Sequence, residues 1–440
     1  MRTGGLTRTG LGIVAAFAVA GSSVGGALSD AEEPDVFRDL PPNGMRVLVR
    51  ETPGAQVVAV SVGIRGGSRD EEAETVGAAH FMEHMYFQGT LRRPNSADID
   101  RDIEALGGWT NAWTGWESIN FQVAAPLEGF DLALDIISDQ MVNSVFAADK
   151  LEKERKVVLE ELNRRLNSPA QKASDLFYLE VFGDHPAHNL PIGNRQTINA
   201  STRDVVVRFR DTYFVAANMT VAVVGDVDHR VVFPKVAAAF ANMRTGPVPE
   251  PRIAPLPPPI SRRLTGSSPG QQARVLIGGP AAGLNSPDRY GLEVIDAVLG
   301  TAGRRLENEI IDKRSLASSV DSSYTELTDV GVWSVGVATQ ASKVDEVIEV
   351  VRGELGRLRE APLADDDLAE AKAFIRGRTL LTRERSADLA VELADGTVLG
   401  YYEALESYLA RIDAVGTEQV QRLALTYLDP DNYTLTVLRP

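Results

Sequence analysis

Residues 245–259 read TGPVPEPRIAPLPPP, and this stretch divides the chain in two. Proline fixes φ and lacks a backbone N–H, so such a run neither continues a helix nor lies in a central strand, and its stiffness suits a spacer. We therefore expect a linker over residues 245–260 between an N-terminal domain, residues 30–244, and a C-terminal domain, residues 261–440. The length of 440 residues also exceeds the ~250–300 residues at which one core usually stops growing.

The regions on both sides of this linker alternate strand-like and helical patterns. Short runs rich in valine and isoleucine predict strands at Val57–Ile64, Thr220–Val224 and Val330–Val337. Long amphipathic stretches between such runs predict helices. The expected fold class is therefore α+β, with mixed α and β structure in each of two domains.

The two domains also resemble each other in sequence. Tyr213, near the end of the first domain, and Tyr427, near the end of the second, are each followed by an asparagine at the same spacing. A helix expected to open at Asp149 has a counterpart at Asp366, at nearly the same offset as the two tyrosines. Internal duplication is the economical interpretation, and the alternative is chance similarity between short amphipathic segments.

Composition narrows the class of protein. Hydrophobic residues make up 44% and charged residues 24%, as in ordinary soluble globular proteins. The formal net charge of −16, from 61 acidic and 45 basic residues, argues against nucleic-acid binding, because a phosphate backbone would be repelled. The chain has no cysteine, which excludes disulfides, thiolate metal sites and a cysteine nucleophile. Any metal must be held by nitrogen and oxygen.

The N-terminal residues have the three-part pattern of an export signal. Two arginines precede an apolar stretch from Leu11 to about Gly21, and mostly small residues follow as far as Ser29. We predict a signal peptide over residues 1–29, a periplasmic or secreted protein, and no stable membrane span after cleavage. The alternative is an uncleaved anchor, although the continuous apolar run is well short of the ~20 residues that a span needs.

The sequence HFMEH, residues 80–84, carries the strongest chemical signal. On a helix, His80 and His84 project from the same face at i and i+4, so both imidazoles reach one ion, and Glu83 lies beside them. This is the inverted H-x-x-E-H arrangement, in which two histidines bind zinc and the carboxylate takes a proton from water at the metal. The alternative is a pair of core or surface histidines.

A catalytic zinc usually has three protein ligands, and the helical run of residues 151–162 offers carboxylates. Glu161 shares an apolar stripe with Val158 and, two helical turns earlier, with Glu154, where unpaired charge is costly. Glu160 instead has basic residues one turn before and one turn after it, as on a solvated face. We predict Glu161 as third ligand and Glu154 as supporting carboxylate; a solvated face for Glu161 is the alternative.

The other three histidines are weaker candidates. His185 and His188 lie in GDHPAHNLPIG, whose prolines and glycines predict a loop. His229 follows a turn-like segment. Surface or loop-structuring roles are favoured over ligation for all three.

Taken together, these motifs resemble the pitrilysin, or insulinase, family of zinc peptidases, and in size and layout the bacterial relatives of mitochondrial processing peptidase. The matching segments are Gly66–Arg69, Gly77–Met85 and Phe87–Thr90. In the family a glutamate ligand follows the H-x-x-E-H motif at about the distance that separates His84 from Glu161 in this chain. The family's supporting glutamate, two helical turns before that ligand, matches Glu154.

The resemblance implies a duplicated half-clamshell of the processing-peptidase type, with one zinc per chain and a second domain without a metal site. Residues 107–114 resemble the family segment whose strand edge holds an extended substrate, which assigns substrate binding to Asn111 and Ala112. An exposed strand edge can bind peptide through main-chain hydrogen bonds. Three tryptophans would line the substrate chamber that such a clamshell encloses or, alternatively, belong to the core: Trp109, Trp113 and Trp116.

The second domain departs from the first at the metal site. The repeat places Arg378 opposite Glu161, so we expect no zinc there. Family members carry an arginine and a tyrosine that assist catalysis in a stretch resembling residues 303–320. Arg305 matches the arginine, whereas Ser318 takes the place of the tyrosine. A homologous partner subunit in a heterodimer would then supply the missing tyrosine, and a homodimer is the alternative assembly.

The resulting prediction is a zinc endopeptidase that hydrolyses peptides or unfolded segments in an enclosed chamber. His80, His84 and Glu161 bind zinc, and Glu83 takes a proton from water and passes it to the leaving amine. One alternative is a non-catalytic scaffold subunit of the kind the family includes. Another is a zinc subunit that is latent without its homologous partner.

Overall fold

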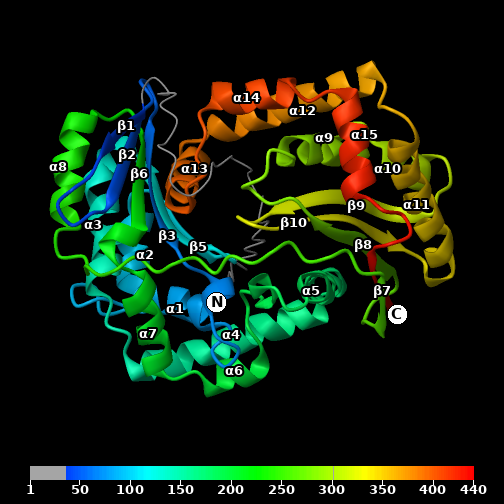
Figure 1. The fold of residues 1–440 in the computed structure, drawn as a ribbon. Coiled ribbons are helices and arrows are strands. Elements are labelled where there is room, and N and C mark those ends of the chain that lie inside the picture. The colour runs from blue at the N-terminus through cyan, green and yellow to red at the C-terminus, as the bar shows by residue number, and fades with distance from the viewer. Residues whose placement is uncertain (1–35, 301) are drawn as a thin grey trace, which may run out of the picture.

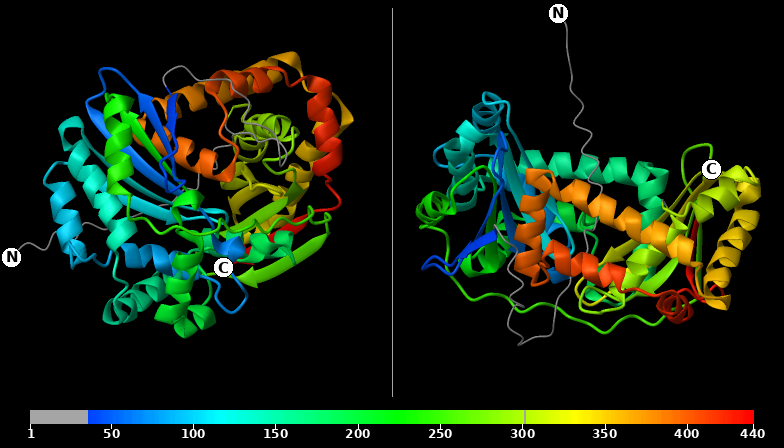
Figure 2. Two further views of the ribbon diagram at one scale, coloured as in Figure 1. Left: turned by 60° about the vertical axis from the view of Figure 1, so that its left-hand side comes forward. Right: turned by 90° about the horizontal axis from the view of Figure 1, so that it is seen from above.

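A computed structural model describes residues 36–300 and 302–440, so the predicted signal peptide, residues 1–29, lies outside the described residues. The described chain forms two mixed α/β halves. Residues 244–261 between them form no helix or strand and run along one side of the molecule (Figures 1 and 2). No described helix combines the length and apolar character needed to cross a membrane.

The first half contains a six-stranded sheet in the order β1-β2-β6-β3-β5-β4. The pair β2–β6 is parallel, and the other neighbouring strands are antiparallel. Its strands are β1 (Val36–Asp39), β2 (Arg46–Glu51), β3 (Val57–Arg65), β4 (Trp109–Thr114), β5 (Ser118–Pro126) and β6 (Met219–Gly225). Its helices are α1 (Ala78–Tyr86), α2 (Ser96–Glu104), α3 (Phe130–Asn143), α4 (Ala148–Asn167), α5 (Pro169–Phe182), α6 (Arg195–Ala200), α7 (Arg203–Tyr213) and α8 (His229–Ala239).

The second half contains a five-stranded sheet in the order β7-β11-β8-β10-β9. Again one pair, β7–β11, is parallel and the rest are antiparallel. Its strands are β7 (Arg262–Ser267), β8 (Ala273–Ala281), β9 (Ala317–Glu326), β10 (Gly331–Thr339) and β11 (Thr434–Arg439). Its helices are α9 (Arg289–Leu299), α10 (Arg305–Glu307), α11 (Val344–Glu360), α12 (Asp365–Arg383), α13 (Ser386–Leu399), α14 (Leu405–Asp413) and α15 (Thr417–Tyr427).

The two halves repeat one topology. Strands β2, β6, β3, β5 and β4 of the first half pair in the same order and sense as β7, β11, β8, β10 and β9 of the second. The helix pair α4–α5 begins at Ala148 and Pro169, and the pair α12–α13 begins at Asp365 and Ser386, so both helices are displaced along the sequence by the same offset. This shared order supports an internal duplication.

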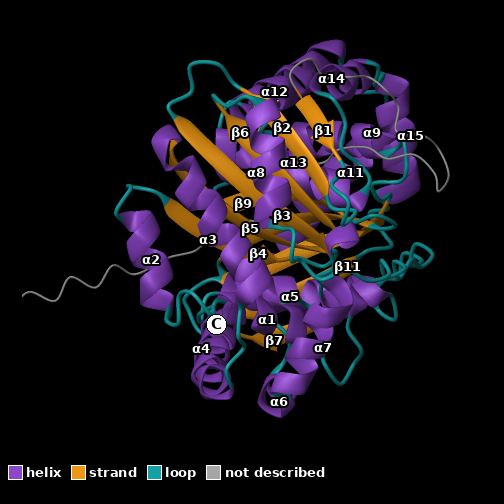
Figure 3. Cartoon of the chain, turned by 90° about the vertical axis from the view of Figure 1, so that its left-hand side faces the viewer, coloured by secondary structure: helices purple, strands orange, loops and turns teal. Residues whose placement is uncertain are grey.

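One helix from each half packs on the sheet of the other half. Helix α13 packs on β3, β5 and β6 of the first sheet, while α5 packs on β8 and β11 of the second. Figure 1 shows α13 beside the first sheet and α5 below the second, and α3 and α8 lie over the outer face of the first sheet (Figures 1 and 3). Because each helix buries its apolar face on the other half's sheet, the two halves form one packed body.

Glycines in the sheets allow these helices to come close. A Cβ added at Gly63 on β3 would lie 2.8 Å from Asp395 Oδ1 of α13. A Cβ added at Gly278 on β8 would lie 2.7 Å from Cζ of Phe177 on α5. Side chains at these two positions would push the crossing helices away from the sheets.

A buried polar cluster also joins the two halves and the linker. The Arg69 guanidinium donates to both oxygens of Asp329, at 2.9 and 2.7 Å, and it also pairs with Glu117. The same guanidinium donates to the carbonyl oxygen of Arg252 in the linker, at 2.5 Å. The backbone N–H of Ala254 donates to Asp329 at 2.7 Å. Buried charges that are paired and hydrogen-bonded in this way fix one geometry, because a slipped arrangement would leave them unpaired.

Candidate metal centre

Helix α1 starts at a glycine that no other residue could easily replace. Gly77 has φ +95°, in the left-handed region, and a Cβ there would lie 2.9 Å from Gly193 Cα. The N-terminal backbone groups of the helix are satisfied by Glu71, whose carboxylate accepts from the N–H groups of Gly77 at 2.8 Å and Ala79 at 2.6 Å. Burial raises the pKa of Glu71 to about 8, although these hydrogen bonds lower it. The sequence reasoning missed Glu71; the available signal was an acidic residue just before a helix whose first residues lack a capping side chain.

Three predicted ligands meet in front of α1. The imidazoles of His80 and His84 are edge to face, with ring centroids 4.7 Å apart. The carboxylate of Glu161, from α4, approaches both: its Oε2 lies 3.6 Å from His80 Nε2 and 3.3 Å from His84 Nε2. Within the described part of the chain, one ligand atom from each residue lies within 4.8 Å of the others. The two histidines of α1, which are four residues apart, and Glu161 on the apolar stripe of α4 therefore point to one place.

The carboxylates around His84 favour a bound cation at this site. His84 Nδ1 lies 3.2 Å from Glu154 Oε2, and with the proton on Nδ1 that nitrogen donates to the carboxylate. The lone pair on His84 Nε2 then faces the negative Glu161 oxygen, a repulsive contact unless a proton or a metal ion lies between them. Two imidazole nitrogens and one carboxylate oxygen are a donor set that zinc accepts, and three protein ligands leave a position for water or substrate. The residues present fit a zinc ion.

The electrostatics of these side chains lead to the same conclusion. Burial lowers the pKa of His80 to about 3, helped by the charge on His84. Burial also acts to lower the pKa of His84, but its hydrogen bonds to Glu154 and Glu161 raise that pKa to about 10. One positive charge is therefore favoured on His84 among the surrounding carboxylates, and a divalent cation satisfies the same negative potential more fully.

Glu83 is held beside the ligands by a residue that the sequence reasoning missed. Its Oε2 accepts a hydrogen bond from Thr114 Oγ1 at 2.6 Å, and Thr114 is the last residue of β4. Burial raises the pKa of Glu83, which suits a group that must accept and then return a proton near neutral pH. No local pattern pointed to Thr114, because the contact joins a helix and a strand 31 residues apart.

The predicted substrate-binding residues lie on β4, an edge strand of the first sheet. Asn111 and Ala112 are in the middle of this strand, opposite Gln122 and Phe121 of β5. Among the three tryptophans, Trp109 is 43% exposed. The Nε1 of Trp116 donates to the carbonyl oxygen of Ala187 at 2.8 Å, and its ring packs on Tyr178 and Phe182. Trp116 thus helps to pack the contact between the halves.

Arg305 and Ser318 are not at this centre. Arg305 begins α10 in the second half, and its Nε lies 3.6 Å from Oε2 of the buried Glu354. Ser318 lies on the edge strand β9 and accepts a hydrogen bond from Gln272 Nε2 at 2.8 Å. Their described contacts are therefore with other residues of the second half.

The other histidines make structural contacts: His188 Nδ1 lies 3.2 Å from the carbonyl oxygen of Leu179, and His185 Nε2 lies 3.5 Å from Asp329 of the second half. His185 begins a 3-10 turn, and its Nδ1 accepts from the backbone N–H of Ala187 at 3.1 Å. His229 forms a second possible ligand cluster with Glu51 and Asp228. Glu51 Oε1 already accepts from both the backbone N–H of His229 and the ring, at 2.9 and 2.8 Å, and Asp228 caps α8. Helix capping accounts for these contacts.

Comparison with known proteins connects this geometry to a family. Residues 46–190 match the model described as insulinase (peptidase family M16), and residues 200–375 match the model of the inactive domain of M16 peptidases. The α+β fold with two mixed sheets, as predicted, corresponds to these N-terminal and inactive C-terminal domains.

Curated relatives match over most of their length. An uncharacterized zinc protease of Mycobacterium leprae is 32% identical over 93% of each chain. One from Streptomyces coelicolor is 30% identical over 88% of this chain and 86% of its own. A probable mitochondrial-processing peptidase subunit beta of Arabidopsis thaliana is 26% identical over 91% of this chain and 77% of its own. The crystal structure of a protease from Helicobacter pylori superposes with a TM-score of 0.86 at 24% identity, covering 92% of this chain and all of that one.

Proposed function

The chain belongs to the insulinase family of peptidases, family M16, as its sequence motifs predicted, and is a zinc protease. From this premise we propose that it is an endopeptidase that holds one zinc ion and cleaves peptides or unfolded segments inside an enclosed chamber. The observation that carries the proposal is the convergence of His80, His84 and Glu161 on one point. A zinc ion bound there supplies Lewis acidity for the scissile carbonyl and lowers the pKa of water to about 7.

Side chains and one strand edge of this protein transfer the proton, orient a ligand and bind the substrate. Glu83 takes a proton from the attacking water and delivers it to the leaving amine, and its hydrogen bond from Thr114 fixes the carboxylate for both steps. Glu154 accepts from His84 Nδ1 and so selects the tautomer whose Nε2 is free to bind metal. The substrate adds to the edge of β4 beside Asn111 and Ala112, through main-chain hydrogen bonds that depend little on sequence.

We further propose that a homologous partner subunit, or a second copy of the chain, completes the chamber. Support comes from Ser318, which stands where the resemblance to the family expects a tyrosine, and from the position of Arg305 away from the metal centre. A zinc subunit that is latent alone is therefore the second candidate function. Adding a co-encoded homologue to the purified chain is then expected to restore cleavage. We also propose a periplasmic or secreted location, because the N-terminal sequence has the pattern of an export signal, and a chain without cysteine tolerates an oxidising compartment.

Metal analysis tests the core of this proposal. The purified chain is expected to carry about one zinc per chain, and Glu161→Gln is expected to lose most of it because one of three ligands is weakened. Glu160→Gln, at the neighbouring position on the same helix, is the matched control and keeps its zinc. A wild-type chain that takes up no zinc, or a Glu161→Gln variant that binds it as tightly as wild type, would show that the ligand set is wrong.

A further inference from the structure

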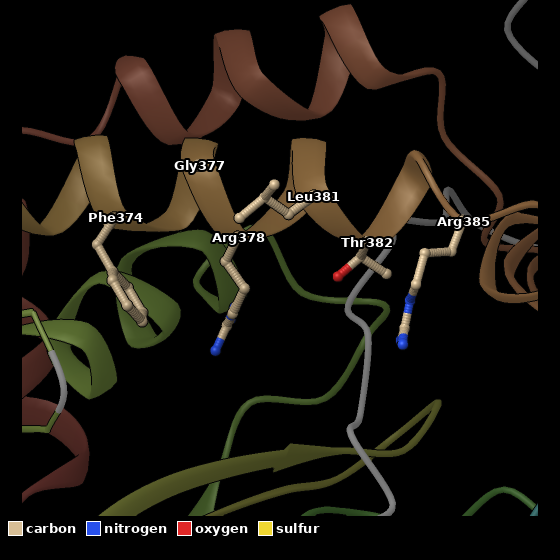
Figure 4. Close-up of a pocket in the computed structure, with 6 residues that line it drawn as sticks. All are labelled: Phe374, Gly377, Arg378, Leu381, Thr382 and Arg385. Carbon is tan, nitrogen blue, oxygen red and sulfur yellow. The ribbon is translucent and has the colours of Figure 1, made fainter.

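The second half has a recess beside the helix that corresponds to α4, and one of its lining residues, Arg378, corresponds to Glu161. It lies along α12 with a volume of about 600 Å³. Figure 4 shows side chains extending from α12 into it, Phe374 and Arg378 among them. The lining residues are Phe374, Gly377, Arg378, Leu381, Thr382 and Arg385.

Helices α12 and α4 correspond residue by residue. In α4, Leu151 and Val158 are buried, and their counterparts at the repeat offset, Leu368 and Ile375, are buried in α12. This register places Arg378 at the position of Glu161. Helix α12 also packs on α9, as α4 packs on α1. The duplicated helix pair thus presents a carboxylate in one half and a guanidinium in the other.

The guanidinium of Arg378 is available to a ligand. Among the described residues it makes no hydrogen bond or ion pair, and its Cζ lies 5.6 Å from the ring centroid of Phe374. The acidic side chains that face it from α9 are Glu293 and Asp296. Tyr408 and Ser322 donate hydrogen bonds to these two carboxylates. Burial raises the pKa of both carboxyls, and Glu293 also interacts with the Arg289 guanidinium, so these two groups balance the charge of Arg378 incompletely.

Apolar surface lies directly beside this charge. Leu381 is 74% exposed, which is high for a leucine, and Phe374 is partly exposed on the same face. Arg385, at the far end of the recess, pairs with the neighbouring Asp388 at the start of α13. A guanidinium flanked by two apolar side chains matches a carboxylate that has an apolar side chain next to it.

We propose that this recess is a substrate-anchoring site that binds a peptide carboxylate flanked by an apolar side chain, with Arg378 as the charged contact. The proposal rests on the proposed function, since it assigns the recess to the peptide that the metal centre cleaves. Helices α4 and α12 lie at opposite edges of the molecule in Figure 1, so only a peptide long enough to reach both uses the recess. The carboxylate is either the C-terminus of the peptide or an acidic side chain, and the test distinguishes these sources.

Binding and cleavage are measured separately to test the proposal. The probe is a fluorescein-labelled peptide of about 20 residues, up to ~66 Å long when extended, with a free C-terminal leucine. Its dissociation constant is measured by anisotropy on the zinc-loaded, full-length Glu83→Gln chain, with and without Arg378→Ala. The loss of a charged hydrogen bond is expected to weaken binding about 10-fold or more. Arg378→Lys, which keeps the charge, is expected to restore part of the affinity.

Matched controls identify the source of the effect. Arg376, close to Arg378 on α12, is paired with Asp413 at 2.6 Å, and Arg376→Ala is expected to leave peptide binding unchanged. Amidating the peptide's C-terminus abolishes the Arg378 effect if the C-terminal carboxylate is bound, whereas changing its glutamates to glutamine does so if a side chain is bound.

Three results would overturn the proposal. The first is that the Arg378→Ala chain binds the free-acid peptide as tightly as its parent chain does. The second is that Arg378→Ala still weakens the binding of the amidated peptide and of the peptide whose glutamates are changed to glutamine. The third is a change in sedimentation mass on Arg378 substitution, which would make this face a subunit contact. In each case cleavage of the peptide by the wild-type chain reports independently on the proposed function.

Discussion

The two halves of this molecule share one topology and differ in what the corresponding helix pairs present. In the first half, α1 carries two histidines and α4 carries Glu154 and Glu161. In the second, α9 carries no histidine, and α12 places Ala371 and Arg378 at the positions of the two glutamates. The buried apolar positions are retained while the polar positions are exchanged. Packing therefore preserves the helix pair, and a few polar side chains decide whether it holds a metal.

The first prediction tests the chemistry of the first half and has the largest expected effect. Glu83→Gln keeps the shape and the hydrogen bond from Thr114 but cannot take a proton, so turnover is expected to fall roughly 10²–10⁴-fold. Zinc content, measured by atomic absorption, is expected to stay at the wild-type level. If zinc and activity disappeared together, Glu83 would have to be reassigned as a ligand.

The second prediction concerns the carboxylate that the second half has replaced by Ala371. Glu154→Gln weakens the acceptor for His84 Nδ1, and zinc affinity measured by chelator competition is expected to fall about 10–100-fold. Glu152→Gln is the control, because Glu152 is exposed on the same helix and pairs with Arg155. Equal zinc affinities for the two variants would remove Glu154 from the metal centre.

Sequence reasoning grouped His80, His84 and Glu161 as candidate ligands, and the structure brings these three side chains together, because the information behind that prediction is local. The i, i+4 spacing of His80 and His84 specifies one helix face, and the stripe on α4 distinguishes Glu161 from the solvated Glu160. The contacts it missed are between elements: Thr114 meets Glu83 only because β4 ends beside α1. An amphipathic pattern likewise shows that α5 and α13 each bury a face, but not that each face lies on the sheet of the other half.

The third prediction sharpens the comparison between the two crossing helices. On α13, the buried Asp395 accepts from Asn120 Nδ2 at 2.7 Å, and burial raises its pKa to about 6. The folded state then holds a proton that the unfolded state has released, so stability present below about pH 4 is lost as pH rises through 6. Asp395→Asn removes this dependence. The unfolding free energy of the variant, relative to that of wild type, is therefore expected to rise by roughly 2 kcal/mol from pH 4 to pH 8. Chemical denaturation at both pH values measures the difference, and parallel pH profiles would contradict the assignment.

The last and smallest effect is expected at the reciprocal crossing, where α5 meets the second sheet through aromatic side chains. Phe177, Tyr178 and Phe182 pack there, and the Tyr178 hydroxyl shares a 2.9 Å hydrogen bond with Thr325 Oγ1. Burial raises the pKa of Tyr178, so this contact does not titrate between pH 4 and pH 8. Tyr178→Phe is therefore expected to cost about 1 kcal/mol of unfolding free energy, by the same amount at both pH values. A cost that changed with pH would mean that the two crossings are coupled, because Asp395 contributes the pH dependence at the first crossing while the second is held by packing.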